Sequence, residues 1–233
     1  MNQVNALNTH CPWSGDPVSA DSITLYRQQP VGFCNPGCRD RFERATLHFD
    51  ALISDPAEGP PPFRSRAVYN RWMNQRLLEA VDKLSDDDYR RDLGAFFRSI
   101  HLTLNHLLVW DVTWLKRLAA RFPEEAALEP LRPRPMPIAH DQELCPDRDA
   151  LRREREALDA VLLAYVEGIS TAKGAQILQY ETRDGQRVRK RVDGVLTHLF
   201  NHQTHHRGQI TTLLSQLGID PGDTDLFLTL EDL

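Results

Sequence analysis

Four of the nine histidines lie in one short segment, His198-Leu-Phe-Asn-His202-Gln-Thr-His205-His206-Arg-Gly-Gln209. If this segment is an α-helix, His202 and His206 lie one turn apart on one face, close enough to bind the same metal ion. His198 and His202 have the same offset. The spacing alone therefore predicts a pair of neighbouring imidazoles without saying which pair it is.

The apolar residues around the histidines select the pair. One stripe at helical spacing contains Val195, Leu199, His202, His206, Ile210, Leu213 and Leu217. Because this stripe should face the core, its two imidazoles need partners for their nitrogens. A metal ion shared with a third histidine from another helix would satisfy them. Two hydrogen-bonded core histidines would do so as well, and the spacing leaves that alternative open.

The composition is that of an ordinary globular protein. The 233 residues are 41% hydrophobic and 26% charged, which suits one large or two small domains. The formal net charge of −5 does not favour a nucleic-acid binder, whose surface would be basic. No apolar run is long enough to span a bilayer, and the N-terminus lacks the pattern of a signal peptide. We therefore expect a cytoplasmic protein that enters no membrane.

Residues 1–50 are expected to form a small separate module. Residues 23–27 and 30–33 have the pattern of two short strands joined by a turn at Gln28-Gln29. A short helix should follow and continue through Phe42. So few apolar residues cannot build a core alone, and modules of this size commonly use a metal ion to hold them together.

Three cysteines of this module, Cys11, Cys34 and Cys38, are candidate ligands. Four cysteines in a chain of this kind favour metal binding or free thiols over disulfides. His10, Asp16 or a residue from elsewhere would complete a tetrahedral zinc site. Three free structural thiols are the alternative.

The cysteine pattern resembles that of the small YHS/TRASH-type metal-binding modules. The resemblance rests on the opening Cys11-Pro-Trp-Ser-Gly15 and the closing Gly32-Phe-Cys34-Asn-Pro-Gly-Cys38. It implies a treble-clef-like zinc module that binds metal or tethers a partner. The fourth cysteine of the chain, Cys145, has no partner at ligand spacing and is expected to be an ordinary thiol.

A proline-rich linker is predicted at residues 51–66, because Pro56, Pro60, Pro61 and Pro62 cannot continue a helix or lie in a central strand. Residues 67–222 should then form a four-helix bundle. We expect its helices at about residues 65–84, 93–121, 147–168 and 193–217, with an extended connection at residues 130–137. The tail, residues 223–233, should pack on the bundle or on a second subunit.

The second of these helices has the apolar stripe Phe96, Ile100, Leu104, Leu107, Trp114 and Leu118. His101, His106 and Asp111 lie at or beside this stripe. Before the last helix, Asp184-Gly185 between two alternating runs predicts a β-hairpin at residues 177–192. Its basic run, residues 187–191, is interpreted as a solvated face rather than as a nucleic-acid patch. The expected fold class is therefore mainly α, a four-helix bundle with one small β-hairpin in the N-terminal module and a second before the last helix.

From Val68 to Gly218 the chain closely resembles the DinB/YfiT-like family. The matching pieces are Tyr69-Asn-Arg-Trp72-Met-Asn74, Thr103-Leu-Asn-His106-Leu-Leu-Val-Trp-Asp111 with Trp114-Leu115, and the histidine segment. The resemblance implies a four-helix bundle, a homodimer, and a divalent-metal site of three histidines, one from the second helix and two from the fourth. Carried over residue by residue, it gives His106, His202 and His206, with His101 as the main rival of His106.

The chemistry of such a site agrees with this ligand set. Three neutral imidazoles leave coordination positions open, as in a catalytic rather than a structural zinc site. Zinc is the metal expected first, with nickel or iron as alternatives. Asn105, Asn201 and Gln209 are candidate partners that orient the imidazoles. Arg207 would attract the carboxylate of a thiol cofactor or form an ion pair on the helix surface.

Two functions are compatible with these residues. The wider superfamily includes thiol S-transferases, which implies a metal-dependent enzyme that joins a low-molecular-weight thiol to a small electrophile. The alternative is a non-catalytic metal-binding or metal-sensing dimeric scaffold carrying an N-terminal zinc module. The residues that would bind a substrate decide between them, and the sequence offers only Arg207 as a candidate.

Overall fold

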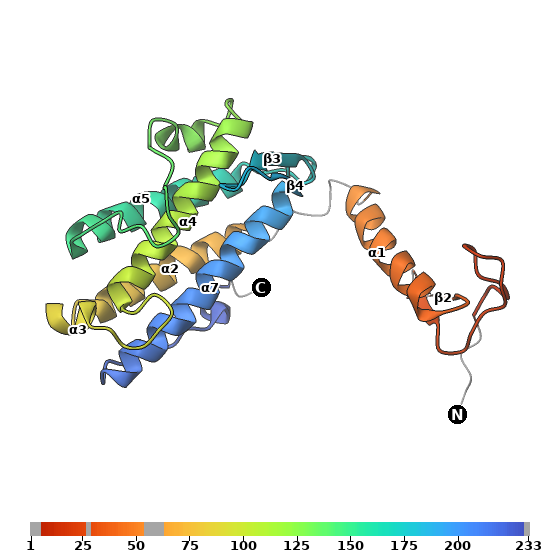
Figure 1. Ribbon diagram of the computed structural model, residues 1–233, viewed down its shortest axis with the longest axis horizontal. Helices are drawn as coiled ribbons and strands as arrows, with labels where there is room; N and C mark the ends of the chain where they lie inside the picture. Colours follow the sequence, from red (N-terminus) through yellow and green to blue (C-terminus); the bar gives the residue numbers. More distant parts are fainter. Residues whose placement is uncertain (1–5, 27–28, 54–62, 231–233) are drawn as a thin grey trace. The chain divides into compact units, whose positions relative to one another are not determined.

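The computed structural model describes residues 6–26, 29–53 and 63–230. The chain divides into two compact units, residues 1–58 and residues 59–233. Each unit has its own secondary structure and is described by itself (Figure 1).

The N-terminal unit is built on one hairpin and one helix. Strand β1 (Ile23–Tyr26) pairs antiparallel with β2 (Gln29–Gly32), and Ile23 lies opposite Gly32. Of the turn expected at Gln28-Gln29, residue 28 lies outside the described residues, and Gln29 is the first residue of β2, opposite Tyr26. The core is small: Phe33 is buried, and its ring centroid lies 5.0 Å from that of Phe42 on α1.

Helix α1 (Pro36–Ile53) is longer than the sequence predicted. The short helix expected to run through Phe42 continues for three more turns, because residues 43–53 contain neither glycine nor proline. The linker predicted at residues 51–66 is therefore helical at both ends, where α1 finishes and α2 begins. The prolines that suggested it lie in residues 54–62, outside the described part of the chain.

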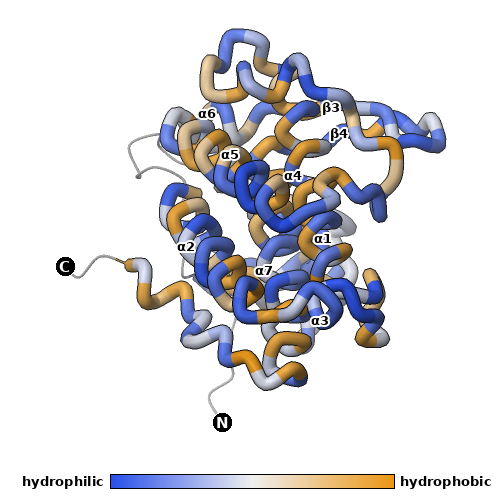
Figure 2. Tube along the Cα trace, turned by 90° about the vertical axis from the view of Figure 1, so that its left-hand side faces the viewer, coloured by the Kyte–Doolittle hydropathy of each residue, from blue (hydrophilic) through white to orange (hydrophobic). Residues whose placement is uncertain are grey.

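Four long helices form the second unit, which confirms the mainly α fold class with small antiparallel hairpins. These helices are α2 (Phe63–Val81), α4 (Ile100–Arg121), α5 (Arg148–Glu167) and α7 (Val192–Gln216). Shorter elements connect or follow them: α3 (Asp86–Arg90), the 3-10 helix η1 (Ala126–Leu131), α6 (Thr171–Gly174) and the 3-10 helix η2 (Leu226–Thr229). Hydrophobic and hydrophilic residues alternate along the long helices, as expected for amphipathic helices around a shared core (Figure 2).

Side-chain caps set several helix beginnings. Ser85, Ser99, Asp147 and Ser170 each accept a hydrogen bond from the backbone N–H three residues later, at the starts of α3, α4, α5 and α6. The start of α5 and the end of α7 agree with the sequence prediction within one residue.

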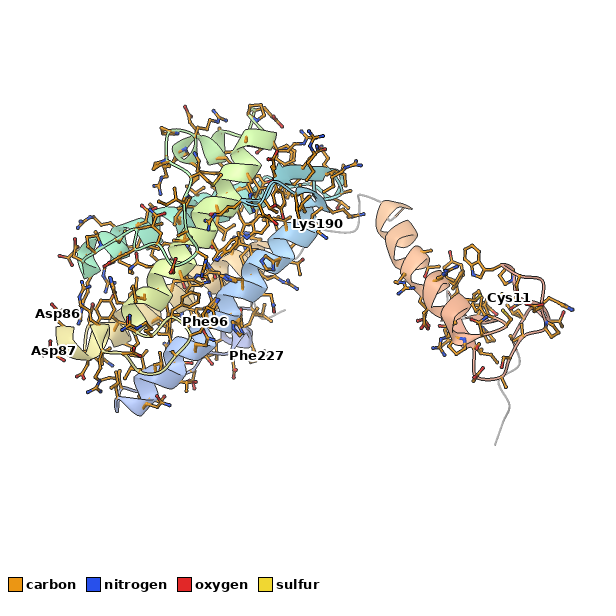
Figure 3. The ribbon with its side chains drawn as sticks, viewed as in Figure 1. Cys11, Asp86, Asp87, Phe96, Lys190 and Phe227 are labelled. Carbon is orange, nitrogen blue, oxygen red and sulfur yellow. The ribbon has the colours of Figure 1, made fainter. Side chains whose placement is uncertain are left out.

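Helix α4 begins seven residues later than predicted, at Ile100 instead of Leu93. Gly94 and Arg98 both have positive φ, 72° and 65°, and such a backbone cannot continue a right-handed helix. Phe96 was therefore wrongly assigned to the buried stripe. Its side chain is 79% exposed and stands on the surface of the bundle, whereas its neighbour Phe97 is buried (Figure 3).

The proline-rich connection after α4 is not extended throughout. Pro130 lies in η1, whose residues Leu128 and Leu131 are fully buried. A 3-10 helix spans only a few residues, so a proline near its end costs little hydrogen bonding. The buried leucines hold the connection against α4.

The second hairpin is the one predicted from Asp184-Gly185. Strand β3 (Ile177–Glu181) pairs with β4 (Arg187–Arg191), and Gly185 has the positive φ of 81° that the turn requires. Leu178 is buried, while most residues of β4 are exposed, so one face of the hairpin is solvated. The hairpin lies at the end of the bundle where α7 begins (Figure 1).

The described part of the tail packs on the bundle. The Tyr69 hydroxyl on α2 donates a 2.6 Å hydrogen bond to the carbonyl of Thr224. Phe227 of η2 is 76% exposed and points away from the core (Figure 3). No helix within the described residues is long and apolar enough to cross a bilayer.

A network of buried charges connects the four long helices. Arg155 on α5 forms ion pairs with Asp111 on α4 at 2.6 Å and with Asp159 at 2.9 Å, and all three side chains are at most 3% exposed. Asn70 and Asn74 of α2 donate to Asp159, each at 3.0 Å. The carboxylates raise the pKa of Arg155 against the opposing effect of burial, so the guanidinium stays charged.

Helix α7 joins the network through Gln203 and Arg207. The Gln203 amide donates to Asp111 at 2.6 Å, and the Arg207 guanidinium donates to the side-chain oxygen of Asn70. Arg155 is thus the cation that pairs with the two aspartates, while Arg207 has a neutral amide as its partner. A buried charge without a partner is costly, so the network favours the helix arrangement that keeps Arg155 between Asp111 and Asp159.

Replacing Arg155 with methionine tests this network. The variant Arg155→Met leaves Asp111 and Asp159 buried without a cation, and we expect it to lower the free energy of unfolding by about 3–5 kcal/mol in urea titrations. Arg152→Met is the matched control, because Arg152 pairs with Asp82 at the surface of the same helix, at 2.6 Å. It should cost less than about 1 kcal/mol. Equal losses in the two variants would show that the buried network contributes no special stability.

Candidate metal centre

Three histidines converge between α4 and α7. The Nε2 atom of His202 lies 3.2 Å from Nε2 of His106 and 3.1 Å from Nε2 of His206. One ring nitrogen from each of the three lies within 4.8 Å of the other two. The structure thus brings together the three residues that the family resemblance gave, two from one helix and one from another.

The hydrogen bonds on the far side of two rings decide which nitrogens face the centre. His106 Nδ1 lies 2.7 Å from the backbone carbonyl of His140, which can only accept, so this nitrogen carries the proton. His206 Nδ1 lies 2.8 Å from Oε1 of Gln209. The side-chain nitrogen of Gln209 lies 3.3 Å from His205 Nε2, and this contact turns the amide oxygen toward His206. In their neutral forms, His106 and His206 therefore both present an Nε2 lone pair to the same point.

Hydrogen bonds among the three rings cannot satisfy this arrangement. His202 has at most one Nε2 proton to donate, and two lone pairs from neighbouring rings compete for it. A metal ion accepts all three lone pairs. In a tetrahedral zinc site with Zn–N distances near 2.0–2.1 Å, ligand nitrogens are about 3.3 Å apart, close to the two observed separations.

The environment keeps these imidazoles neutral, as metal ligands must be. Burial lowers the pKa of His106 to about 4 and that of His202 to about 3. The neighbouring His206 adds to both effects, since two positive charges at this distance repel. The pKa of His206 is lowered as well, again chiefly by burial.

Aromatic rings surround the centre. The Phe97 ring stacks on His106 with centroids 3.8 Å apart and meets His206 edge-on at 5.5 Å. Trp110 lies edge-on to both His106 and His202. These rings exclude water from one side of the centre. The sequence did not identify Phe97, because it lies in the loop that was taken for the start of α4.

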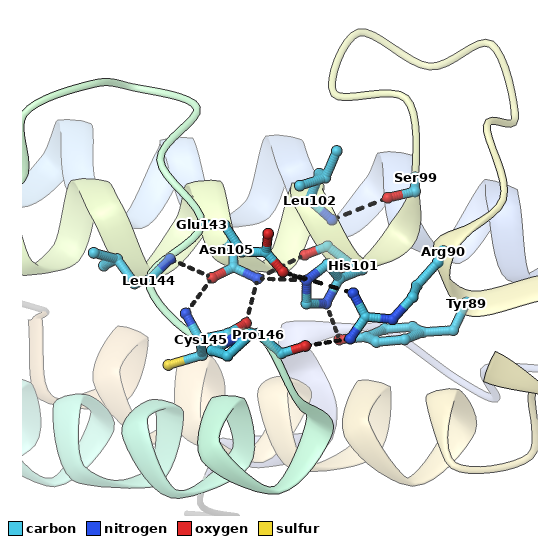
Figure 4. A network of polar contacts seen from close by, with 10 residues as sticks. All are labelled: Tyr89, Arg90, Ser99, His101, Leu102, Asn105, Glu143, Leu144, Cys145 and Pro146. Atoms are coloured by element: carbon cyan, nitrogen blue, oxygen red, sulfur yellow. Dashed lines mark hydrogen bonds and ion pairs between the residues drawn. The ribbon is translucent and has the colours of Figure 1, made fainter. Parts of the chain in front are cut away.

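His101, the rival of His106, belongs to a different set of contacts (Figure 4). Its Nδ1 lies 3.0 Å from the Tyr89 hydroxyl, and its Nε2 lies 2.6 Å from a carboxylate oxygen of Glu143. Both ring nitrogens are therefore engaged away from the three-histidine cluster. Burial lowers the pKa of His101, while the Glu143 carboxylate opposes that effect.

The three candidate orienting residues lie in different places. Gln209 contacts His206 as described above. Asn105 holds the connection before α5 instead: its side-chain oxygen accepts from the backbone N–H groups of Leu144 and Cys145, both at 2.8 Å (Figure 4). Asn201 is exposed on the other side of α7 and has no hydrogen bond to the cluster. The carbonyl of His140 was not predicted, because a backbone group leaves no signal in the sequence.

The surface ion pair expected for Arg207 is not formed. The side chain is not on the helix surface, since the residue is only 3% exposed. Its guanidinium donates to Asn70 and lies 3.3 Å from the Thr204 hydroxyl oxygen, on the other side of α7 from the histidine pair. Arg207 belongs to the buried network of the bundle.

The N-terminal unit brings Cys11, Cys34 and Cys38 together. Their sulfur atoms lie within 4.8 Å of one another, and Cys34 Sγ and Cys38 Sγ are 3.8 Å apart. Cys34 follows β2, and the Asn35 side chain accepts from the N–H of Cys38 at the start of α1. With Zn–S distances of about 2.3 Å, tetrahedral thiolates are about 3.8 Å apart, so the observed spacing fits zinc.

Within the described residues, His10 and Asp16, the two residues considered as a fourth ligand, lie outside the cysteine group. His10 Nδ1 lies 3.0 Å from the Thr9 hydroxyl instead. Burial raises the pKa of Cys11, but backbone N–H groups of Cys34, Ser14 and Trp13 outweigh it and bring the value to about 6. Burial and the neighbouring thiols raise the pKa of Cys38. Cys145 is buried in the second unit and is not a member of this group.

Comparison with known proteins gives a family match over most of the chain. A sequence profile described as the DinB family matches residues 64–232. The chain is 26% identical over 170 residues to Protein DinB of Bacillus subtilis (strain 168), an alignment that covers 69% of this chain and 91% of that protein. No solved structure gives a significant match.

The lowered pKa values of the cluster predict how the stability of the metal-free protein depends on pH. The unfolded chain takes up protons on these histidines near pH 6.5, whereas folded His106 and His202 take them up only near pH 4 and 3. The free energy of unfolding should therefore fall as the pH drops from 6.5 toward 4. We expect urea titrations in EDTA to show this decline, and the decline should be smaller in His202→Gln. A decline of the same size in His202→Gln would contradict the assignment of a lowered pKa to His202.

Zinc should stabilise the bundle through the three histidines. At a zinc concentration about a hundredfold above its Kd, the unfolding temperature should rise by roughly 5–10 °C. We expect His206→Ala to lose this rise. His198→Ala is the control, because His198 is exposed, lies one turn earlier than His202 on α7 and is outside the cluster. Thermal unfolding followed by far-UV circular dichroism gives the unfolding temperature of each variant with and without zinc. Equal zinc responses in the two variants would show that the cluster does not bind the metal.

Proposed function

The chain belongs to the DinB family, and on that basis we propose that it binds one divalent metal ion through His106, His202 and His206 and uses it as a thiol S-transferase. The observation that carries this proposal is the convergence of two imidazole lone pairs on a third ring, which a cation resolves. Zinc is the metal that best fits three neutral imidazoles, with nickel or iron as alternatives.

The residues of the chain have definite tasks in this proposal. The His140 carbonyl and the Gln209 amide hold His106 and His206 with Nε2 toward the metal. Phe97 and Trp110 keep water from one side of the centre. When bound, the metal would supply Lewis-acid activation, lowering the pKa of a thiol so that it is nucleophilic near neutral pH.

The ligand set leaves room for such chemistry. Within the described residues, no fourth histidine, cysteine, aspartate or glutamate joins the three histidines. Three protein ligands with open positions are typical of catalytic zinc, whereas structural zinc sites are closed by four. The partners proposed on this ground are a low-molecular-weight thiol and a small electrophile. A cytoplasmic location and a homodimer remain part of the proposal.

A second function is favoured by the cysteine cluster. Cys11, Cys34 and Cys38 form a separate candidate metal site in their own compact unit. A protein that binds metal at two places without catalysis would be a sensing or delivery scaffold. In that case the N-terminal zinc module would bind metal or a partner, and the bundle would serve as the support.

An activity assay separates the two functions. Zinc-loaded full-length protein is mixed with glutathione or L-cysteine and 1-chloro-2,4-dinitrobenzene. The thiol sulfur bonds to the ring carbon, chloride leaves, and the thiol proton passes to solvent. We expect the wild-type protein to make the reaction faster than it is without protein. His202→Gln should lower this catalysed rate by about a hundredfold or more, whereas His198→Gln should keep the wild-type rate. His198 is exposed and lies one turn earlier on α7.

The assay also has an outcome that rejects the enzyme. The enzyme is rejected if the rate is the same with wild-type protein, with His202→Gln and without protein, while the wild type binds metal. The three-histidine site would then belong to a non-catalytic scaffold.

A further inference from the structure

A cavity of about 680 Å³ lies beside α4, away from the three histidines. Its wall comes from three parts of the chain: Thr113, Lys116 and Arg117 of α4, the segment 136–138, and the β3 residues with the turn that follows. The cavity is large enough for a small organic molecule. Neither the metal centre nor the buried charge network uses it.

Positive charge dominates the wall of this cavity. Lys116, Arg117 and Arg183 line it, against Glu181 as the one acidic residue in the wall. None of the three cations pairs with a carboxylate in the described part of the chain. The Lys116 ammonium donates to the carbonyls of Leu131 and Arg132, at 2.9 and 3.1 Å, and Arg183 donates to the carbonyl of Pro137 at 3.1 Å.

Arg117 is the residue most in need of a partner. Its guanidinium lies 4.0 Å from the ring centroid of Tyr180 and 4.7 Å from that of Trp114. Burial lowers the pKa of Arg117, and the nearby Arg183 lowers it further. Within the described residues it has no hydrogen-bond acceptor. Because the two aromatic rings restrict its side chain, the planar fork of donors is already positioned to bind an anion.

One segment of the cavity wall is apolar. Met136 is 44% exposed and Ile138 is 82% exposed, with Pro137 between them. A ligand that fills the cavity would therefore meet both cations and aliphatic carbon. Amphipathic molecules with one charged end have this distribution.

We propose that this cavity binds a small amphipathic organic anion, with its carboxylate or phosphate on the guanidinium of Arg117 and its apolar part against Met136 and Ile138. The proposal does not depend on metal at the three histidines. The chain nevertheless connects the cavity to the three histidines. The segment that forms the apolar wall continues to His140, whose carbonyl accepts the hydrogen bond from His106.

Calorimetric titration of the full-length protein tests the proposal. The probes are 4-phenylbutyrate, phenyl phosphate and the neutral 4-phenylbutanamide. We expect one of the two anions to bind at least about tenfold more tightly than the amide, because charge-assisted hydrogen bonds are the stronger ones. The better anion identifies the preferred end group. Titrations with and without added zinc should agree, so failure of this cavity and failure of the metal site are separate results.

Two variants attribute the binding to the cavity. Arg117→Met should weaken binding of the preferred anion by about tenfold or more and leave the amide unchanged. Arg121→Met is the matched control, since Arg121 lies one turn further along α4 and does not line the cavity. If Arg117→Met does not fold, Arg183→Met takes its place with the same expected direction. Equal binding of anions and amide, or equal effects of the Arg117 and Arg121 variants, would overturn the proposal.

Discussion

The ion pairs of Arg155 with Asp111 and Asp159 constrain the bundle as a whole. They lie where the four long helices meet, and Asn70, Asn74, Gln203 and Arg207 complete the set of partners. A shift of one helix would leave a charge buried without its partner, at a cost of several kcal/mol. Gln203 follows His202 on α7, and Asp111 lies on the helix that carries His106. The contact that aligns α4 with α7 therefore also holds the three imidazoles together.

Side-chain periodicity predicted the parts of the structure that depend on single helices. The apolar stripe of α7 placed His202 and His206 toward the core, and the structure has His206 buried and His202 partly buried. The turn at Asp184-Gly185 depends on backbone conformation at Gly185, so its neighbours in sequence were sufficient to predict it. The choice between His101 and His106 was different. Both are buried on α4, and only the packing shows that His101 faces Tyr89 while His106 faces α7.

The misassigned residues lie where connections between elements decide the outcome. Phe96 and Phe97 are adjacent and equally apolar, yet the positive φ of Arg98 and the cap at Ser99 place one outside and the other on His106. Asn105 looked like a partner of the imidazoles but fixes the chain before α5. The His140 carbonyl orients His106 from a loop more than thirty residues away in sequence. Such contacts depend on the path of the chain, which periodicity does not encode.

The two candidate centres differ in chemistry, one with three imidazole nitrogens and the other with three sulfurs. The metal content per chain, measured by elemental mass spectrometry on protein purified without a histidine tag, decides whether both centres bind metal. The two-site assignment predicts two metal ions per chain, one of which remains when Cys34 is replaced with serine. A single ion that disappears in Cys34→Ser would contradict it, because the three histidines would then be core residues that bind no metal.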